Sequence, residues 1–415
     1  MGSISFVIYP QCSFVLRAQC LLSIVFKRVG ILLLACVLCT ISSCGSNPDH
    51  ARDAGIKEAA YKTEDPPKYG TITLEFEEEF VLGEDPEGND FASRSDIEVD
   101  SKGTIYVLDY GMKEVVVFDS TGQRVGTIGR EGSGPGEFSR PLQTNLVSDD
   151  ELFVVEIYRI HSFHADGTVR FTQRNEGVLI RFQALINGGR LGVISKTVDD
   201  KILETLVVID SLNQITREND DIPTMLGSRT TLSDGSPLSV RVNHIYTPRF
   251  ILSAIQPDRL IYANTHEYAL NVLDRRGDTL RIIRRDLPKA PISKKQKETV
   301  IESVSKNPTA RTWPKHLLEE AIYFPDSQPF FWGVITDDKE RIYVFLANME
   351  ADQGPEHNSV DIFSKDGTYL YQAKSEVSPS VIRNGKAYGI TVDQETGNPT
   401  VTCWTITNWS DLKIE

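Results

Sequence analysis

The histidines and cysteines are the side chains of this chain that could most readily bind a metal or act as nucleophiles. His161 and His164 stand three residues apart in a predicted β-strand, and alternation along a strand places them on opposite faces. Cys36 and Cys39 form a Cys-x-x-Cys pair, but they lie inside an apolar N-terminal run rather than in a folded domain. No Gly-x-Ser-x-Gly sequence is present. The sequence therefore predicts no catalytic residues and no set of metal ligands.

A glycine-rich stretch at residues 128–138 invites a second chemical interpretation, a loop that binds phosphate. A P-loop that began at Gly129 would need lysine directly after Gly134, and Pro135 stands there instead. The dinucleotide pattern Gly-x-Gly-x-x-Gly does not fit either. We therefore expect no nucleotide cofactor, and no other cofactor is predicted from these residues.

The charge balance excludes one class of partner. The 415 residues include 44 basic and 58 acidic side chains, which gives a formal net charge of −14. Binding to nucleic acid requires a cationic surface that neutralises phosphates. We expect no nucleic-acid partner.

The N-terminus has the parts of a secretory signal. Lys27 and Arg28 precede a short apolar run at residues 30–39, and small residues follow it. The run is too short to span a bilayer. The sequence Ile41-Ser42-Ser43-Cys44-Gly45 resembles the lipobox of bacterial lipoproteins. That resemblance implies a signal peptide at residues 1–43 and a lipid on Cys44. It also implies an exported protein of the outer membrane, held there by its anchor and facing the periplasm or the cell surface.

The residues after Cys44 are poor in apolar side chains, and we interpret residues 44–69 as a tether. Of the six cysteines, only Cys44 and Cys403 would remain after the signal is removed. No internal disulfide is then possible, and packing must stabilise the fold.

A repeat in the body of the chain decides the fold class. Short apolar strands end in turns of the form Asp-x-x-Gly, with Asp capping backbone amides and Gly supplying a positive φ. The first of these turns is spaced about 45 residues from the next, which is the length of a four-stranded propeller blade. The turns stand at residues 119–122, 164–167, 210–213, 274–277 and 364–367.

The connector at residues 128–138, with Pro141 after it, resembles the segment between blades of NHL-type propellers. Residues 70–407 as a whole are similar to six-bladed β-propeller lipoproteins of Gram-negative bacteria. The resemblance implies an all-β fold in that region, and it assigns no chemistry, because the function of that group is largely unassigned.

Five outer turns mark five blades, and the C-terminal segment supplies only three strands for a sixth. We predict that residues 71–81 add the missing outer strand and close the ring, which pairs edges that would otherwise stay open. Residues 286–328 interrupt the repeat between blades four and five as a helical insertion, with Ser293 and Gln296 as a capping box. Residues 408–415 form a C-terminal tail.

The long insertions and the glycine-rich connector should all emerge on one face of the propeller, where we expect the binding site. The residues on that face most suited to recognition are aromatic or arginine side chains: Tyr110, Arg130, Arg140 and Tyr158. We expect a binding or scaffolding module for an unidentified protein or small ligand. The alternative is a metal-dependent hydrolase or lyase that holds Ca²⁺ or Zn²⁺ over the central channel, with ligands scattered among blades.

Overall fold

The computed structural model describes residues 57–62, 64–83, 91, 95–198, 201–226, 228–231, 237–240, 244–306, 322–347, 358–392 and 398–414. The predicted signal peptide, Cys44 and the first part of the predicted tether lie outside these residues. Within the described residues, no helix is both long enough and apolar enough to cross a membrane.

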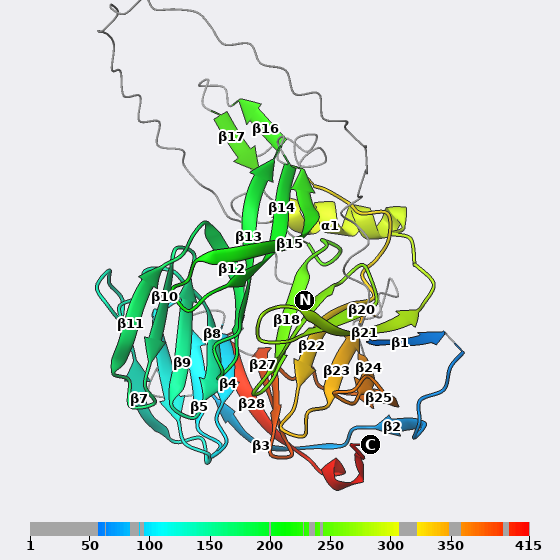
Figure 1. The fold of residues 1–415 in the computed structure, drawn as a ribbon, viewed down its shortest axis with the longest axis horizontal. Coiled ribbons are helices and arrows are strands. Elements are labelled where there is room, and N and C mark those ends of the chain that lie inside the picture. Colours follow the sequence, from blue (N-terminus) through cyan, green and yellow to red (C-terminus); the bar gives the residue numbers. More distant parts are fainter. Residues whose placement is uncertain are drawn as a thin grey trace, which may run out of the picture.

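The fold is a six-bladed β-propeller (Figure 1). The first three blades each run from the axis outward in chain order. Blade one contains β4 (Ser95–Val99), β5 (Ile105–Asp109), β6 (Glu114–Phe118) and β7 (Arg124–Ile128). Blade two contains β8 (Pro141–Ser148), β9 (Glu151–Glu156), β10 (Arg159–Phe163) and β11 (Val169–Arg174). Blade three contains β12 (Val178–Ala184), β13 (Arg190–Val198), β14 (Lys201–Ile209) and β15 (Ile215–Leu226).

The last three blades include strands from the start of the chain. Blade four contains β18 (Phe250–Ile255), β19 (Arg259–Asn264), β20 (Ala269–Leu273) and β21 (Thr279–Asp286), with β1 (Lys57–Lys62) on its outer edge. Blade five contains β22 (Phe331–Thr336), β23 (Ile342–Leu346), β24 (Asn358–Phe363) and β25 (Tyr369–Ser375), with β2 (Thr71–Thr73) outside. Blade six contains β26 (Val381–Arg383), β27 (Lys386–Val392), β28 (Pro399–Ile406) and β3 (Phe76–Leu82).

The apolar pattern of each strand follows its distance from the axis. Every residue of β5 is buried, because both faces of this strand pack against neighbouring blades. The outer strand β7 is exposed except at its last residue, Ile128. Burial of apolar side chains between blades therefore supplies the core, as the all-β prediction requires.

The predicted turns have the expected capping geometry. In the first inner turn, the Asp100 carboxylate accepts hydrogen bonds from the amides of Lys102 and Thr104, at 2.9 and 2.7 Å. Gly103 follows with a φ of +86°, where a residue with a Cβ would be strained. In the outer turn of blade three, Asn213 stands where blade one has Gly122, with a φ of +58° that asparagine tolerates better than most residues.

The glycine-rich connector between blades one and two is held by a buried ring. Phe138 is fully buried, and a Cβ on Gly129 would lie 2.3 Å from the Phe138 ring. Position 129 therefore requires glycine for two reasons: the Phe138 ring leaves no room for a Cβ, and the φ of +75° would strain any other residue. The Glu137 carboxylate accepts hydrogen bonds from the amides of Ser133 and Gly134, which fixes the loop.

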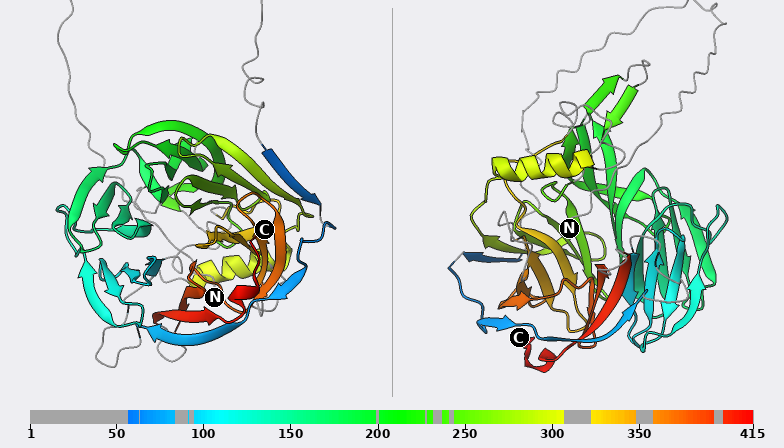
Figure 2. Two further views of the ribbon diagram at one scale, coloured as in Figure 1. Left: turned by 60° about the horizontal axis from the view of Figure 1, so that its bottom comes forward. Right: turned by 180° about the vertical axis from the view of Figure 1, so that it is seen from behind.

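The N-terminal segment closes the ring, although its path differs from the prediction. Strand β3 pairs antiparallel with β28 and completes blade six as expected. Residues 71–73, which we assigned to the same closing strand, instead form β2 and pair in parallel with β25 of blade five. Before that, β1 pairs in parallel with β21 of blade four. The blue strands run along the outside of three consecutive blades (Figure 2).

This path corrects the predicted tether, because residues from 57 onward are part of the fold. Tyr61 of β1 packs against the rings of Phe363 and Tyr369, and its hydroxyl donates to the Gly367 carbonyl at 2.7 Å. We call residues 57–73 the strap. The strap joins blades four and five before the chain enters blade six.

The insertion between blades four and five contains the predicted helix. Helix α1 (Lys294–Lys306) begins with the expected capping box: the Gln296 amide donates to Ser293 Oγ, and the Ser293 amide donates to Gln296 Oε1. Val300 and Val304 lie on the buried face of this helix. Helix α1 and the hairpin of β16 (Ser228–Thr231) and β17 (Pro237–Val240) lie at the same end of the molecule (Figures 1 and 2). Residues 307–321 of the predicted helical insertion lie outside the described residues.

The predicted C-terminal tail is packed against the propeller. A 3₁₀ turn at Trp409–Asp411 brings the Trp409 ring over the guanidinium of Arg341, with 4.0 Å from the ring centroid. Arg341 is buried; it donates to the Leu412 carbonyl at 2.8 Å and pairs with Asp337 at 2.6 Å.

Candidate functional site: the central channel and the arginine pocket

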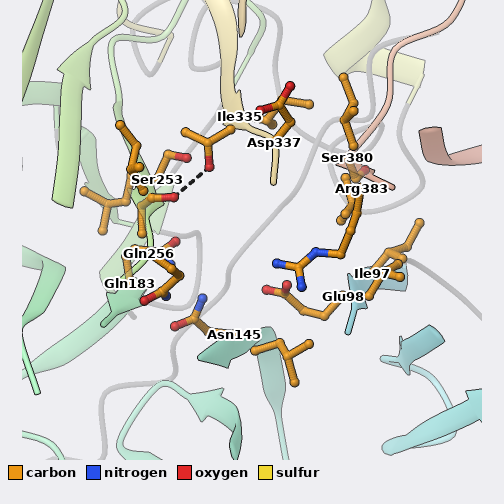
Figure 3. Close-up of a pocket in the computed structure, with 18 of the residues that line it drawn as sticks. Ile97, Glu98, Asn145, Gln183, Ser253, Gln256, Ile335, Asp337, Ser380 and Arg383 are labelled. Atoms are coloured by element: carbon orange, nitrogen blue, oxygen red, sulfur yellow. Dashed lines mark hydrogen bonds between the residues drawn. The ribbon is translucent and has the colours of Figure 1, made fainter. Parts of the chain in front are cut away.

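The inner strands of all six blades surround a cavity of about 410 Å³, which we call the central channel. Strands β4, β8, β12, β18, β22 and β26 each contribute residues to its wall. Side chains at alternating positions of an inner strand face the axis. Most of the side chains labelled in Figure 3 are polar or charged. The channel is therefore suited to a polar ligand rather than to an apolar one.

Several polar side chains in the channel wall are occupied by bonds between neighbouring blades. Gln143 makes two hydrogen bonds, both of 3.0 Å, to the backbone of Phe182. Gln256 donates to the Ala184 carbonyl at 3.1 Å. The Thr144 amide and hydroxyl donate to Asp96 at 2.8 and 3.0 Å. These side chains hold blades one to four together around the axis.

Glu98 and Arg383 lie next to each other on one wall of the channel (Figure 3), and Glu98 also accepts hydrogen bonds from Leu146 and Asn145 of blade two. Burial in the disc and the negative charge of Asp96 raise the pKa of Glu98 to about 8, against the opposing effects of the Leu146 amide, Arg383 and Asn145. Burial also raises the pKa of Asp96. Glu98 is therefore mostly protonated at pH 7 and neutralises little of the Arg383 charge.

The opposite wall offers neutral hydrogen-bonding groups. Gln183 and Ser253 line the channel there (Figure 3), and no side-chain hydrogen bond in the described part of the chain engages either of them. Arg383, which forms no ion pair within the described part of the chain, thus faces two neutral polar groups across the cavity. The lining also contains Asp337 and Glu340, which pair with Arg341 and Lys365. This arrangement can hold an anionic group beside Arg383 and accept or donate hydrogen bonds on the other side.

A metal site can be tested against the ligands present. In the part of the chain that the structure describes, no group of three or more His, Cys, Asp or Glu side chains is arranged to hold an ion. A Ca²⁺ or Zn²⁺ ion over the channel belongs to the alternative that the sequence left open.

The four residues that we predicted for binding fall on one face by topology, but only two of them meet. Tyr110 lies in the turn between β5 and β6 and is 37% exposed. The Arg130 side chain is 78% exposed and pairs with Glu137 within the connector, at 2.8 Å. Neither residue lines the central channel.

Arg140 and Tyr158 line a second cavity of about 550 Å³ at blade two. Arg159, Arg174, Glu156 and Asn175 line it as well, and we call it the arginine pocket. Arg140 lies between the connector and β8, Tyr158 lies in the turn between β9 and β10, and Arg174 is the last residue of β11. Tyr110 and Arg130 do not line this pocket, and the binding roles of all four residues remain predictions.

Sequence reasoning missed Glu98 and Arg383. Both lie in short inner strands, at positions 98 and 383, and blades one and six bring them together only after ring closure. A usable signal was a charged side chain within an otherwise apolar inner strand, as in Val381-Ile382-Arg383. His161, as expected, is a buried structural residue: its ring bonds Thr172 and Glu156 at 2.9 and 3.1 Å.

Comparison with known proteins supports the fold. Residues 73–175 match a family model described as "6-bladed beta-propeller" (DUF5128). No curated protein matches the sequence.

Three solved structures illustrate the likeness. A Bacteroides fragilis protein described as exported is 12% identical, with a TM-score of 0.49, over 85% of this chain and 100% of that one. A DUF4221 member from Bacteroides vulgatus is 12% identical, with a TM-score of 0.44 and coverages of 81% and 99%. Virginiamycin B lyase from Staphylococcus aureus is 10% identical, with a TM-score of 0.37 and coverages of 80% and 99%. The strand order, together with the match over residues 73–175, makes this chain a six-bladed β-propeller.

Proposed function

We propose that this protein is an exported, lipid-anchored propeller that binds a small polar anion, such as a sugar acid, in its central channel. One observation carries the proposal: the guanidinium of Arg383 faces a cavity of about 410 Å³ and is used by no ion pair or hydrogen bond among the described residues. A cation in a deep, partly desolvated site favours an anionic partner over water.

The neighbouring carboxyl groups strengthen this argument. A pKa of about 8 leaves Glu98 mostly neutral at pH 7, so it competes little with a ligand carboxylate for Arg383. In its protonated form Glu98 also donates a hydrogen bond, which a second ligand oxygen can accept. An oxyanion beside Arg383 thus finds one charged donor and one neutral donor.

The rest of the cavity favours a hydroxylated ligand. Gln183 and Ser253 supply hydrogen-bond donors and acceptors opposite Arg383. The cavity volume falls in the usual range for small-molecule sites, roughly 300–1,000 Å³. A monosaccharide acid carries both the carboxylate and the hydroxyl groups that these walls can satisfy.

The lipid anchor rests on the sequence Ile41-Ser42-Ser43-Cys44 behind a short apolar run. Its resemblance to a lipobox supports export and attachment at the outer membrane, with a periplasmic or surface orientation. A propeller held at the envelope by its N-terminus is well placed to capture small molecules there.

The binding proposal is tested by calorimetric titration of the purified full chain with glucuronate, galacturonate and gluconate, with glucose as the uncharged control. At least one acid should bind with saturation, and glucose should bind at least tenfold more weakly. A ligand at 100 times its Kd should also stabilise the fold by about 2.7 kcal/mol in thermal melts. Arg383→Gln should abolish the binding, whereas Arg124→Gln, on the outer strand of blade one, should not change it.

The proposal fails if none of the acids binds, or if Arg383→Gln binds them as tightly as the original chain. Mass spectrometry of the ligand after the titration separates binding from turnover. Conversion of the sugar acid to a product would show a hydrolase or lyase instead of a binding protein.

A further inference from the structure

The arginine pocket is a second candidate for ligand binding, independent of the channel. It opens on the face that carries the glycine-rich connector, and its wall includes Arg140, Arg159 and Arg174. Three arginines in one cavity are unexpected for a chain with a net charge of −14. The question is which of these charges remain available to a ligand.

Glu156, which also lines the pocket, neutralises the charge of one arginine. Its side chain is 3% exposed and pairs with Arg159 at 2.6 Å. Its Oε1 accepts hydrogen bonds from the amides of Ser139 and Arg140, at 2.7 and 2.6 Å. Burial opposes ionisation of Glu156, yet the bonds from His161 and these amides, together with the Arg159 charge, lower its pKa to about 2. Glu156 is therefore a permanent anion that fixes the connector and neutralises Arg159.

Arg159 is further committed to the pocket wall. Its Nη1 donates to the Ser133 carbonyl at 2.8 Å, and its Nη2 donates to Ser139 Oγ at 3.2 Å. Arg159 thus serves as a structural brace between blade two and the connector. The positive charge of the pocket that remains for a ligand therefore comes from Arg140 and Arg174.

Arg140 and Arg174 are exposed, and no ion pair or hydrogen bond among the described residues uses either guanidinium. Two like charges that line one cavity repel each other, and a bound anion would relieve that repulsion. The backbone of Arg140 is held by Glu156, so its side chain starts from a fixed position. The pocket is thus built to receive an oxyanion.

Tyr158 adds a flat apolar surface to the same cavity. Tyr158 is 55% exposed. Arg140 and Arg174, which line the same pocket, supply its positive charges. Rings of sugars and bases pack on exposed tyrosines, and arginine binds phosphate oxygens through two parallel N–H donors. We propose that the arginine pocket binds a phosphate monoester on a sugar ring, with the phosphate between Arg140 and Arg174 and the ring against Tyr158.

The proposal is tested by calorimetric titration of the full chain with glucose 6-phosphate, inorganic phosphate and glucose. Glucose 6-phosphate should bind at least tenfold more tightly than either of the others. The Arg140→Ala/Arg174→Ala variant should lose tenfold or more in affinity with an unchanged melting temperature, because both side chains are exposed. Tyr158→Ala should weaken glucose 6-phosphate binding and leave inorganic phosphate unaffected.

Two further variants separate this site from the rest of the molecule. Arg276→Ala, in an outer turn of blade four on the opposite face, is the control and should bind glucose 6-phosphate as the original chain does. A loss of glucose 6-phosphate binding in Arg383→Gln would place this ligand in the central channel and contradict the proposal. If the double arginine variant binds as tightly as the original chain, or if inorganic phosphate binds as tightly as glucose 6-phosphate, the proposal is wrong.

A phosphorylated sugar can be free or part of a lipid headgroup, and a vesicle arm distinguishes the two sources. Phosphatidylcholine vesicles with and without phosphatidylinositol 4-phosphate are sedimented with the original chain and with the double arginine variant. Extra retention of the original chain on the phosphorylated vesicles indicates a headgroup ligand. Equal retention of both proteins, together with tight binding of glucose 6-phosphate, indicates a free sugar phosphate.

Discussion

At the scale of single residues, two glutamates show how hydrogen bonding decides ionisation in this fold. Glu98 and Glu156 are both placed deep in the propeller, and burial raises the pKa of each. Glu156 accepts bonds from His161 and two amides beside Arg159, and its pKa falls to about 2. Glu98 lies beside Asp96 with fewer donors, and its pKa rises to about 8. Burial, the negative charge beside Glu98 and the donors around Glu156 together set the difference.

We predict that Glu98 makes the stability of the fold depend on pH. Its pKa is about 8 in the folded protein, against an ordinary value of 4.5 for a glutamate in water, so the folded state binds this proton more tightly. The resulting stabilisation is complete below about pH 4.5 and is lost as the pH rises through 8. Glu98→Gln removes this dependence. The melting temperature of the variant, relative to the original chain, should therefore increase from pH 5 to about pH 8 and then level off toward pH 9.

The measurement is a series of thermal melts of both proteins at pH 5, 6.5, 8 and 9. Glu131→Gln is a suitable control, because the Glu131 side chain is 71% exposed. A difference between the Glu98→Gln variant and the original chain that stays constant over this range would contradict the assigned ionisation of Glu98.

At the scale of elements, local signals predicted most of the blades. The Asp-x-x-Gly turns, the connector around Phe138 and the Ser293–Gln296 capping box each depend on residues close together in the sequence, and the structure contains all three. The strap depends on distant pairing instead. Strand β1 has the sequence Lys-Glu-Ala-Ala-Tyr-Lys, which carries little strand preference of its own. It forms because it pairs with β21 at the edge of blade four, and no local sequence pattern predicts this pairing.

The candidate site was less predictable for the same reason. Arg140 and Tyr158 could be placed on one face from the alternation of turns. Their shared pocket depends on Glu156, at the end of β9, which binds the backbone amide of Arg140. The contact between Glu98 and Arg383 depends on ring closure between blades one and six. Such pairs follow from tertiary geometry alone.

We predict that the strap stabilises the propeller through Tyr61. The Tyr61 ring packs on Phe363 and Tyr369, and its hydroxyl both donates to Gly367 and accepts from the Tyr369 amide, at 2.7 and 3.0 Å. Tyr61→Phe should reduce the free energy of unfolding by about 0.5–1.5 kcal/mol, through the lost hydrogen bonds. Tyr61→Ala should reduce it by about 3 kcal/mol, since the ring contacts are lost as well.

Urea denaturation of the two variants and the original chain gives these values. Lys57→Ala, at the exposed start of β1, is the control and should change the free energy of unfolding by less than about 0.5 kcal/mol. Equal stability of Tyr61→Ala and the original chain would show that the strap contributes nothing to the fold.

At the scale of the whole molecule, both ends of the described chain are used to lock the ring. Strand β3 completes blade six, and the Leu412 carbonyl accepts from Arg341 of blade five. The strap crosses blades four and five on the outside. These contacts fix where the N-terminal residues leave the propeller, at the outer edge of blade four. The two candidate ligand sites lie elsewhere, along the axis and at blade two.

The distance between Cys44 and the propeller is therefore short. Strand β1 begins at Lys57, and an extended chain from position 44 to position 57 spans at most roughly 45 Å. A lipid on Cys44 would keep the outer edge of blade four near the membrane surface. Diacylglycerol with a further acyl chain anchors a protein stably, because each buried CH₂ contributes about 0.8 kcal/mol.

We predict that Cys44→Ser releases the protein from the membrane fraction of the expressing bacterium, because the thiol that accepts the lipid is lost. After cell lysis and a carbonate wash, the original chain should sediment with membranes, and the Cys44→Ser variant should remain in the supernatant. Cys403→Ser is the matched control: Cys403 is fully buried in blade six, so this change should leave the chain with the membranes. A Cys44→Ser variant that still sediments after the wash would exclude attachment through Cys44.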